Sequence, residues 1–332
     1  MPDPTPGSTP DLMRALVIDR LGGPDELHVA SVPRPVRILD EVLVRVIAAG
    51  VNPVDAKTRA GRGTSAAIPS FPTILGYDFA GVVEQTPYAA HPLQPGDRVY
   101  GMGRTPRVGG TYAEYAAVTS MSVAKMPASL DFAHAAAVPL AALTAWGAVV
   151  ETARVHDGQR VLVHAGAGGV GQFAVQFAAY FGAVVTATGS AANAELLRSL
   201  GARHVVDYRA ERFEEVAGGQ DVVIDLIGNV ADDTGTRSLA ALRPGGLVVS
   251  VPTGAWPTMR EDAAASGMRA TGYVVSADAR TLAVITRLID DGAVRVHVDR
   301  EFALEDGAEA HRVLEAGHVR GKLVLRVADD PA

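Results

Sequence analysis

The feature that most constrains this chain is a glycine-rich segment between a strand-like run and a helix-like run. Residues 160–164 are mostly apolar and β-branched, residues 165–171 read AGAGGVG, and a helical pattern follows as far as residue 181. A glycine-rich turn from a strand into a helix is typical of the phosphate-binding loop of a dinucleotide-binding unit. The sequence therefore predicts a dinucleotide at this turn. The alternative is a tight turn that only packs a helix against a strand.

The residue types in this loop give a physical reason for the prediction. Glycines let the backbone approach a pyrophosphate closely, and the first turn of the helix supplies unpaired N–H groups and a partial positive charge. The residues expected to contact the cofactor are Gly166, Ala167, Gly168, Gly169, Val170 and Gly171.

The residues that follow the second predicted strand indicate which dinucleotide binds. NAD sites usually carry Asp or Glu there, which holds the ribose 2′-hydroxyl. Here the strand ends at Ser190, followed by two alanines and Asn193, so no carboxylate would repel a 2′-phosphate. Ser190 and Asn193 can donate hydrogen bonds, and Tyr208 and Arg209 end the next strand. We therefore predict NADPH rather than NADH. An ordinary surface role for Tyr208 and Arg209 is the alternative.

The distribution of strand and helix patterns predicts two domains of different kinds. From residue 136 to 269 strands and helices alternate, which predicts an α/β domain with a doubly wound parallel sheet. Residues 13–126 are β-branched runs separated by turns, which predict a compact barrel-like domain. Helices over 280–290 and 304–316 and a closing strand over 322–327 follow. A chain of 332 residues is long enough for two domains.

Composition argues against several classes of function. The net charge is −7, which opposes nucleic-acid binding because phosphates require a basic face. No segment is apolar over the roughly 20 residues that a membrane span needs. The chain has no cysteine, which excludes disulfides and thiolate metal sites and fits a cytoplasmic protein. Residues 1–12 lack the pattern of a secretory signal, and we predict a disordered tail.

Several motifs together resemble a known family, the zinc-independent medium-chain dehydrogenase/reductases, and most closely the quinone oxidoreductases. The motifs run through nearly the whole chain: residues 49–55, 75–81, 95–99, 109–115, 139–145, 165–171 and 317–324. The resemblance implies a GroES-like β-barrel catalytic domain built from residues 13–135 and 270–332, with a Rossmann nucleotide-binding domain over 136–269. It also implies a homodimer, often formed by edge strands, here expected at residues 272–276.

The resemblance further implies where the chemistry takes place. Zinc-using relatives have Cys at the position of Asn52, His near the position of Lys57, and Gly-His-Glu where this chain has Gly-Tyr77-Asp. An amide, an ammonium and a phenol are poor zinc ligands, so we expect no metal. The catalytic candidates carried over are Asn52, Asp55, Lys57 and Tyr77, as hydrogen-bond donors or orienting groups near the nicotinamide.

Two further positions concern the cofactor. The resemblance implies that Thr144 lies near the nicotinamide ribose. The family often places Lys on the 2′-phosphate where this chain has Asn193, and Arg209 could compensate for its absence.

These observations predict a reductase that transfers hydride from NADPH to a quinone or an α,β-unsaturated carbonyl. An alcohol dehydrogenase, with or without zinc, and a non-catalytic NADPH-binding sensor or structural protein are the alternatives. The substrate pocket is expected to include loops at residues 59–71, 104–108 and 253–261. These loops hold few aromatic residues, Phe71 and Trp256, so the sequence leaves quinone and enone substrates open.

Overall fold

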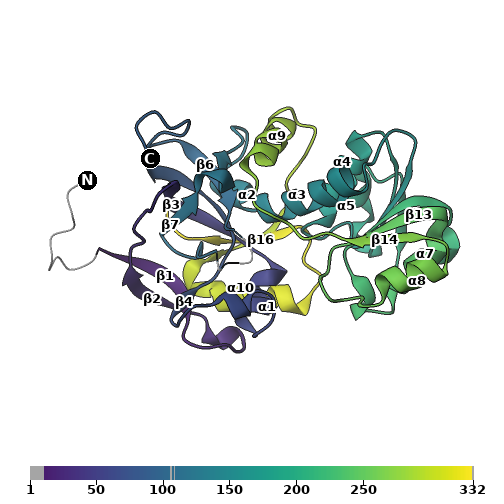
Figure 1. The fold of residues 1–332 in the computed structure, drawn as a ribbon, viewed down its shortest axis with the longest axis horizontal. Helices are drawn as coiled ribbons and strands as arrows, with labels where there is room; N and C mark the ends of the chain where they lie inside the picture. The colour runs from purple at the N-terminus through teal and green to yellow at the C-terminus, as the bar shows by residue number, and fades with distance from the viewer. Residues whose placement is uncertain (1–10, 105–106, 108, 331–332) are drawn as a thin grey trace.

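The computed structural model describes residues 11–104, 107 and 109–330, which form two domains side by side (Figure 1). One domain contains the first strands of the chain together with its last strands. The other is formed by the middle of the chain, shown in teal to green. The predicted class, a barrel-like domain beside a parallel α/β domain, is confirmed.

The barrel-like domain is built from two sheets. The smaller one is antiparallel, in the order β2 (His28–Pro33), β1 (Leu12–Ile18), β4 (Thr73–Ile74). The larger one has the order β15 (Val298–Ala303), β16 (Lys322–Arg326), β3 (Glu41–Val51), β5 (Asp78–Gln85), β6 (Arg98–Met102), β8 (Val123–Lys125), and β7 (Tyr115–Thr119) also pairs with β3. Because β16 pairs with β3, this sheet combines strands from the N-terminal part of the chain with the last strands of the chain.

The predicted tail over residues 1–12 needs one correction. Residues 1–10 lie outside the described residues, but Leu12 already belongs to β1, where it pairs with Pro33. Alternation of buried and exposed residues begins in this strand, and Met13 packs against Ala15 and Val17. The strand pattern therefore reaches back one residue further than the composition of the tail suggested.

The nucleotide domain contains a six-stranded parallel sheet. Its order is β11 (His204–Asp207), β10 (Val184–Gly189), β9 (Arg160–Val163), β12 (Gln220–Asp225), β13 (Leu242–Ser250), β14 (Arg269–Gly272). Strand order reverses at β9 and β12, and ligands bind beside such a switch point in doubly wound sheets.

Helices cover both faces of this sheet, which explains its continuous apolar strands. Val161 and Val163 of β9 face a core shared with α3 (Pro139–Trp146), α4 (Gly171–Tyr180) and α5 (Ala194–Ser199). Leu162 faces a second core, shared with α6 (Phe213–Val216), α7 (Thr234–Ala241) and α8 (Met259–Ala265).

The edge of the sheet differs from its predicted position. The expected edge strand over 272–276 is wrong in its bounds, because β14 spans Arg269–Gly272 and residues 273–278 form no ladder. The side chain of Tyr273 packs against Gly147, the residue that directly follows α3: a β-carbon on Gly147 would lie 1.9 Å from its ring. The sheet thus runs slightly past the expected domain boundary at residue 269 before the chain leaves for α9 (Ala279–Asp290).

The two domains are joined by packed helices and by hydrogen bonds. α2 (Phe132–Ala136), α3 and α9 lie between them (Figure 1). The Tyr100 hydroxyl donates to the Leu282 carbonyl in α9 at 2.9 Å. Gly321 N–H donates to the Ala167 carbonyl of the glycine loop at 2.8 Å. This last bond places the start of β16 directly against the predicted cofactor loop.

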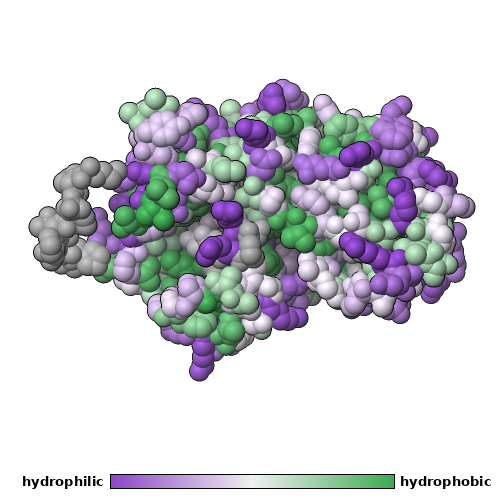
Figure 2. Space-filling model, viewed as in Figure 1, coloured by the Kyte–Doolittle hydropathy of each residue, from purple (hydrophilic) through white to green (hydrophobic). Residues whose placement is uncertain are grey.

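On the barrel side, α1 (Pro53–Arg59) and α10 (Gly307–Ala316) lie side by side and are linked by the buried Arg59 guanidinium and Glu315. In the part of the chain that the structure describes, no helix has the length and apolar character needed to cross a membrane. Figure 2 shows hydrophilic residues over much of one face, with only small hydrophobic groups between them.

Candidate active site

The glycine loop turns from β9 into α4, and two of its glycines are required by packing. A β-carbon on Gly166 would lie 2.9 Å from the Leu197 side chain, and one on Gly171 would lie 2.1 Å from the Ala165 carbonyl oxygen. Ala165 itself has a φ of 49°, an uncommon conformation for a residue with a β-carbon. The tight-turn explanation therefore accounts for Gly166 and Gly171.

The other two glycines are not explained in this way. The nearest neighbour of a β-carbon on Gly168 would be the Ala165 carbonyl oxygen at 3.3 Å, and on Gly169 the Lys322 side chain at 3.1 Å. Neither position requires glycine as strictly as Gly171 does. The N-cap residue of α4, Val170, provides no side-chain cap. The Gln172 and Phe173 amides donate to backbone carbonyls, which leaves the amides of Val170 and Gly171 for an anion. This backbone cradle fits a dinucleotide pyrophosphate.

The residues predicted to surround the 2′-phosphate meet at the ends of β10 and β11. Gly189 and Asp207 are in register, so Ser190 and Tyr208 follow on neighbouring strands. The Asn193 N–H donates to the Ser190 carbonyl at 2.9 Å. Tyr208 is half exposed, and the Arg209 guanidinium lies 5.6 Å from its ring centre. These hydroxyl, amide and guanidinium groups suit a phosphate.

Close to the loop lies a buried polar cluster whose centre is the ammonium group of Lys322. Lys322 Nζ donates to the Val51 carbonyl at 3.0 Å, to Asp78 Oδ2 at 3.3 Å and to Asn52 Oδ1. Asn52 Nδ2 donates to the same Asp78 oxygen at 2.8 Å. Asp78 Oδ1 accepts from the Leu140 N–H at 2.7 Å, at the N-terminus of α3. The cluster thus joins β16, α1, β5 and α3.

A second part of the cluster surrounds Asp55, whose side chain closes a capping box with Asn52 at the start of α1. Asp55 Oδ2 accepts from the Asn52 N–H at 2.8 Å and from the Tyr112 hydroxyl at 2.9 Å. His311 Nε2 lies 3.5 Å from that hydroxyl. Burial raises the pKa of Asp55 to about 7. Its Oδ1 is buried and has no hydrogen-bond partner.

The remaining predicted side chains lie apart from the centre of this cluster. The buried Tyr77 donates its hydroxyl proton to the Arg107 carbonyl at 2.7 Å and lies 2.8 Å from Thr64 Oγ1, so it joins the two loops expected to line the substrate pocket. Part of the 104–108 loop lies outside the described residues. Lys57 is exposed. Thr144 is buried in α3, and its hydroxyl donates to the Leu140 carbonyl at 2.6 Å.

The chemistry of the cluster does not suit zinc. The centre of the cluster is the Lys322 ammonium group, which would repel a divalent cation. The side chains in contact with this ammonium are one amide, that of Asn52, and one carboxylate, that of Asp78. Among the residues that the structure describes, no three His, Cys, Asp or Glu side chains come together as metal ligands. The donor set of this cluster therefore does not fit a zinc ion.

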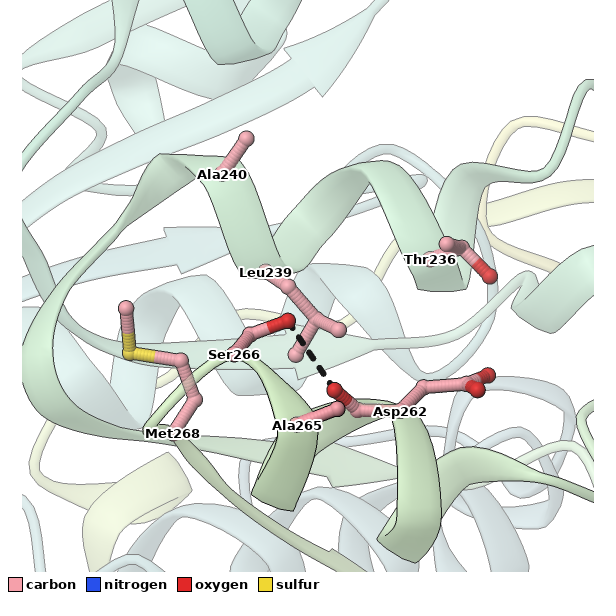
Figure 3. A pocket seen from close by; sticks show the side chains of 7 residues that line it. All are labelled: Thr236, Leu239, Ala240, Asp262, Ala265, Ser266 and Met268. Carbon is pink, nitrogen blue, oxygen red and sulfur yellow. Dashed lines mark hydrogen bonds between the residues drawn. The ribbon is translucent and has the colours of Figure 1, made fainter.

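A separate depression lies on the nucleotide domain between α7 and α8 (Figure 3). Asp262, on its wall, already accepts from Trp256 Nε1 at 2.7 Å and from Thr258 at 2.8 Å. None of its lining residues belongs to the glycine loop or to the buried polar cluster: Thr236, Leu239, Ala240, Asp262, Ala265, Ser266 and Met268. This depression is therefore not part of the candidate active site.

The fold and the site define a two-domain oxidoreductase with a dinucleotide loop against a buried polar cluster. Comparisons with known proteins agree. The family model described as "Alcohol dehydrogenase GroES-like domain" matches residues 39–128, and that described as "Zinc-binding dehydrogenase" matches residues 200–325. An NADPH-dependent alkenal/one oxidoreductase of Arabidopsis thaliana is 37% identical, covering 96% of this chain and 80% of the relative. The 2-methylene-furan-3-one reductase of Solanum lycopersicum shows the same identity and coverage.

Among solved structures, a quinone oxidoreductase from Coxiella burnetii superposes with a TM-score of 0.90 at 36% identity, over 96% of this chain and 100% of the other. The chain belongs to the medium-chain dehydrogenase/reductase superfamily, in its quinone oxidoreductase-like branch. The predicted family is confirmed.

Four members of the cluster escaped the prediction of site residues: Asp78, Tyr112, His311 and Lys322. Lys322 carried a usable signal, because it is a charged residue at the start of an apolar closing strand. Such a lysine is rarely buried without a partner. Tyr112 and His311 carried none, since only the fold brings them to Asp55.

Proposed function

We infer that this chain is an NADPH-dependent reductase that adds hydride to the conjugated carbon–carbon double bond of α,β-unsaturated carbonyl compounds, and to quinones. The observation that carries this function is the direct contact between the glycine loop and the buried polar cluster, through Gly321 and Lys322. The relatives named above support NADPH as the cofactor and an oxidoreductase as the class of enzyme, as the sequence predicted.

NADPH, when bound, supplies the hydride; the protein holds it and manages charge and protons. The amides of Val170 and Gly171 and the open backbone at Gly168 would hold the pyrophosphate. Ser190 and Arg209 would contact the 2′-phosphate. This division leaves the chain with two tasks: to stabilise the negative charge that develops on the carbonyl oxygen, and to hold a proton.

Asn52 and Lys322 are suited to the first task. The Asn52 amide uses one hydrogen on Asp78, and its other contact, to the Gly50 carbonyl, is long at 3.4 Å. That second hydrogen is available to a carbonyl oxygen bound against the cluster. The buried ammonium of Lys322 adds positive charge behind it, in surroundings where water screens little.

Asp55 is suited to the second task. Its pKa of about 7 means that the buried carboxyl is partly protonated at neutral pH. Tyr112 and Asn52 both donate to Oδ2, so the proton would reside on the unpartnered Oδ1. A carboxyl with a pKa near the working pH is effective in proton transfer. Reduction of an enone takes up one such proton at the α-carbon.

The names of the relatives favour enones as the first class to test. Two relatives at 37% identity are called an alkenal/one oxidoreductase and a 2-methylene-furan-3-one reductase, both after unsaturated carbonyl compounds. The quinone oxidoreductase structure, at 36%, keeps quinones as the second class.

We also propose that the protein is a homodimer paired through β14. This strand is the outer edge of the nucleotide-domain sheet, and Val274, just after it, is 71% exposed. An exposed edge strand is a ready site for pairing with another chain. Light scattering on the wild type and on Val274→Arg tests this: a monomeric wild type would contradict it.

Loss of NADPH absorbance at 340 nm tests the activity, with a panel of alkenals, alkenones and quinones and with NADH in parallel. We expect turnover with NADPH that is unchanged by a zinc chelator. Loss of activity with the chelator would instead support a zinc alcohol dehydrogenase. Stoichiometric NADPH binding without turnover of any acceptor would support a non-catalytic binding protein.

A further inference from the structure

Behind the glycine loop lies a buried histidine that the mechanism does not use. His164 directly precedes the loop, is 1% exposed, and its ring meets the edge of Phe213 at 4.5 Å between ring centres. Both ring nitrogens have partners on other elements: Nδ1 lies 3.2 Å from Thr188 Oγ1 at the end of β10, and Nε2 lies 3.0 Å from Ser238 Oγ in α7.

Thr188 holds the start of the loop with both its side chain and its backbone. Its Oγ1 accepts from the Ala165 N–H at 3.1 Å, and its carbonyl accepts from the Gly166 N–H at 2.9 Å. Ala165 adopts a left-handed backbone conformation, which costs roughly 1–2 kcal/mol for a residue with a β-carbon. The surroundings must therefore fix this residue, and the Thr188 hydroxyl is one of the groups that do so.

For a neutral His164 ring, the hydrogen-bond partners of the network assign its hydrogens. Ser238 Oγ lies 2.7 Å from the Thr234 carbonyl, which can only accept, so the serine proton is used there. Ser238 must then accept from His164, and Nε2 carries the ring hydrogen.

The hydrogens on the Thr188 side of the network are assigned in the same way. The Ala165 amide can only donate, so Thr188 Oγ1 accepts there and its own proton is free. Nδ1 of a neutral His164 is an acceptor, and the threonine proton points to it.

We propose that His164, as the neutral Nε2–H tautomer, is a positioning residue for NADPH: it orients the Thr188 hydroxyl, which holds Ala165 and so presets the phosphate-binding loop. On one side of the ring, the Ala165 N–H donates to the Thr188 hydroxyl, which donates to His164 Nδ1. On the other side, His164 Nε2–H donates to the Ser238 hydroxyl, which donates to the Thr234 carbonyl. This assignment rests on the proposed function only in taking NADPH as the ligand of the loop.

The electrostatic surroundings keep the ring neutral. Burial lowers the pKa of His164 to about 4. Asp225 and Glu214 raise it and Arg237 lowers it, but burial dominates. At neutral pH the ring therefore has one hydrogen, and the hydroxyl network decides which nitrogen carries it.

The first test removes single hydroxyl groups. Thr188→Val keeps the shape of the side chain and the backbone bond to Gly166 but removes the acceptor for Ala165. We expect NADPH to bind on the order of 10-fold more weakly by calorimetry, since one buried hydrogen bond to the loop is lost. Thr188→Ser, which keeps the hydroxyl, should bind NADPH as tightly as the wild type. Equal affinity in Thr188→Val and wild type would overturn the proposal.

The second test follows the tautomer directly. Nitrogen NMR of histidine-labelled protein without cofactor should show His164 as Nε2–H at pH 7; an Nδ1–H ring or an imidazolium would refute the assignment. Ser238→Ala, which does not touch the loop, should allow the Nδ1–H form and weaken NADPH binding. An unchanged tautomer and affinity in Ser238→Ala would contradict the proposal.

The same experiments separate this proposal from the proposed function. If the wild type binds no NADPH, the proposed function fails, whatever the tautomer is. If the wild type binds NADPH and the variants bind equally well, only the role of His164 fails. A purely structural role would lower the melting temperature without changing the Kd for NADPH, which also counts against positioning.

Discussion

Replacing Lys322 by methionine tests the centre of the buried polar cluster. The side chains are similar in length, so the change removes the charge and three hydrogen bonds while largely keeping the shape. Asp78 is fully buried, and burial raises its pKa while the Lys322 ammonium opposes that rise. Without Lys322, the carboxylate keeps only its bonds from Asn52 and from the Leu140 N–H at the start of α3.

The magnitude follows from the burial of both partners. Removing one member of a buried ion pair typically costs about 3–5 kcal/mol, because the other charge stays buried without compensation. For a protein of this size we expect the melting temperature to fall by roughly 10 °C at neutral pH. Lys57→Met is the matched control, since Lys57 is exposed, and it should change stability by less than about 0.5 kcal/mol.

The pH dependence makes the test sharper. In Lys322→Met the folded-state pKa of Asp78 rises further above its unfolded value, so the folded state binds the extra proton. Stability that is present below the unfolded pKa is then lost as pH rises, by about 1.4 kcal/mol per pH unit. The difference from wild type should be small near pH 4 to 5 and largest near pH 8, by urea unfolding followed by circular dichroism.

A double variant decides whether the charge itself is responsible. Lys322→Met with Asp78→Asn removes both charges and keeps an acceptor for the Leu140 N–H, so it should recover a large part of the lost stability. If the single variant is as stable as Lys57→Met at every pH, or if the double variant is no more stable than Lys322→Met, the ammonium does not compensate Asp78 and the reasoning is refuted.

Four further substitutions test the loop, the specificity and the buried histidine. Gly168→Ala should keep the fold but weaken NADPH binding, whereas Gly171→Ala, whose β-carbon would lie 2.1 Å from the Ala165 oxygen, should destabilise the protein in thermal melts; the reverse pattern would contradict the cradle. Ser190→Asp should weaken NADPH about 10-fold or more relative to NADH, because a carboxylate repels the 2′-phosphate, as measured by the two KM values. Because burial lowers the pKa of His164 to about 4 from 6.5, the unfolded state binds its proton first and stability should fall as pH drops through this range, by up to about 3 kcal/mol. His164→Phe should flatten this acid limb, and an equally steep limb in the variant would show that other groups cause it.

The sequence predicted the elements whose pattern is local. The βαβ unit around the glycine loop could be read because apolar periodicity changes from strand to helix within about 20 residues. The joining of β16 to β3, across more than half of the chain, could be expected only from the resemblance to a family. The edge at β14 was misplaced because residues 273–276 are strand-like in composition. In the structure the Tyr273 N–H still donates to the Ser250 carbonyl of β13, but the ladder ends at Gly272 and the Tyr273 ring packs against Gly147.

The site was predictable to the extent that family motifs marked it. Asn52 and Asp55 lie in the buried polar cluster, but Lys57, chosen from the same motif, is exposed. No periodicity distinguishes these positions, since the outcome depends on which side of α1 packs against α10 and the barrel. Tyr77 is buried as a core residue is, and its hydroxyl is used on the loops at Thr64 and Arg107.

Two consecutive residues explain why the cofactor loop and the cluster form one site. Gly321 donates its N–H to the loop at Ala167, and Lys322, next in the chain, donates into the cluster. Gly321 has a φ of 82°, and a β-carbon there would lie 2.2 Å from the His297 carbonyl oxygen, so the close approach requires glycine. Any shift of β16 relative to α4 would therefore move the loop and the ammonium together. The geometry between cofactor and polar groups is thus set by one strand end that contacts both domains, rather than by the packing of the domains alone.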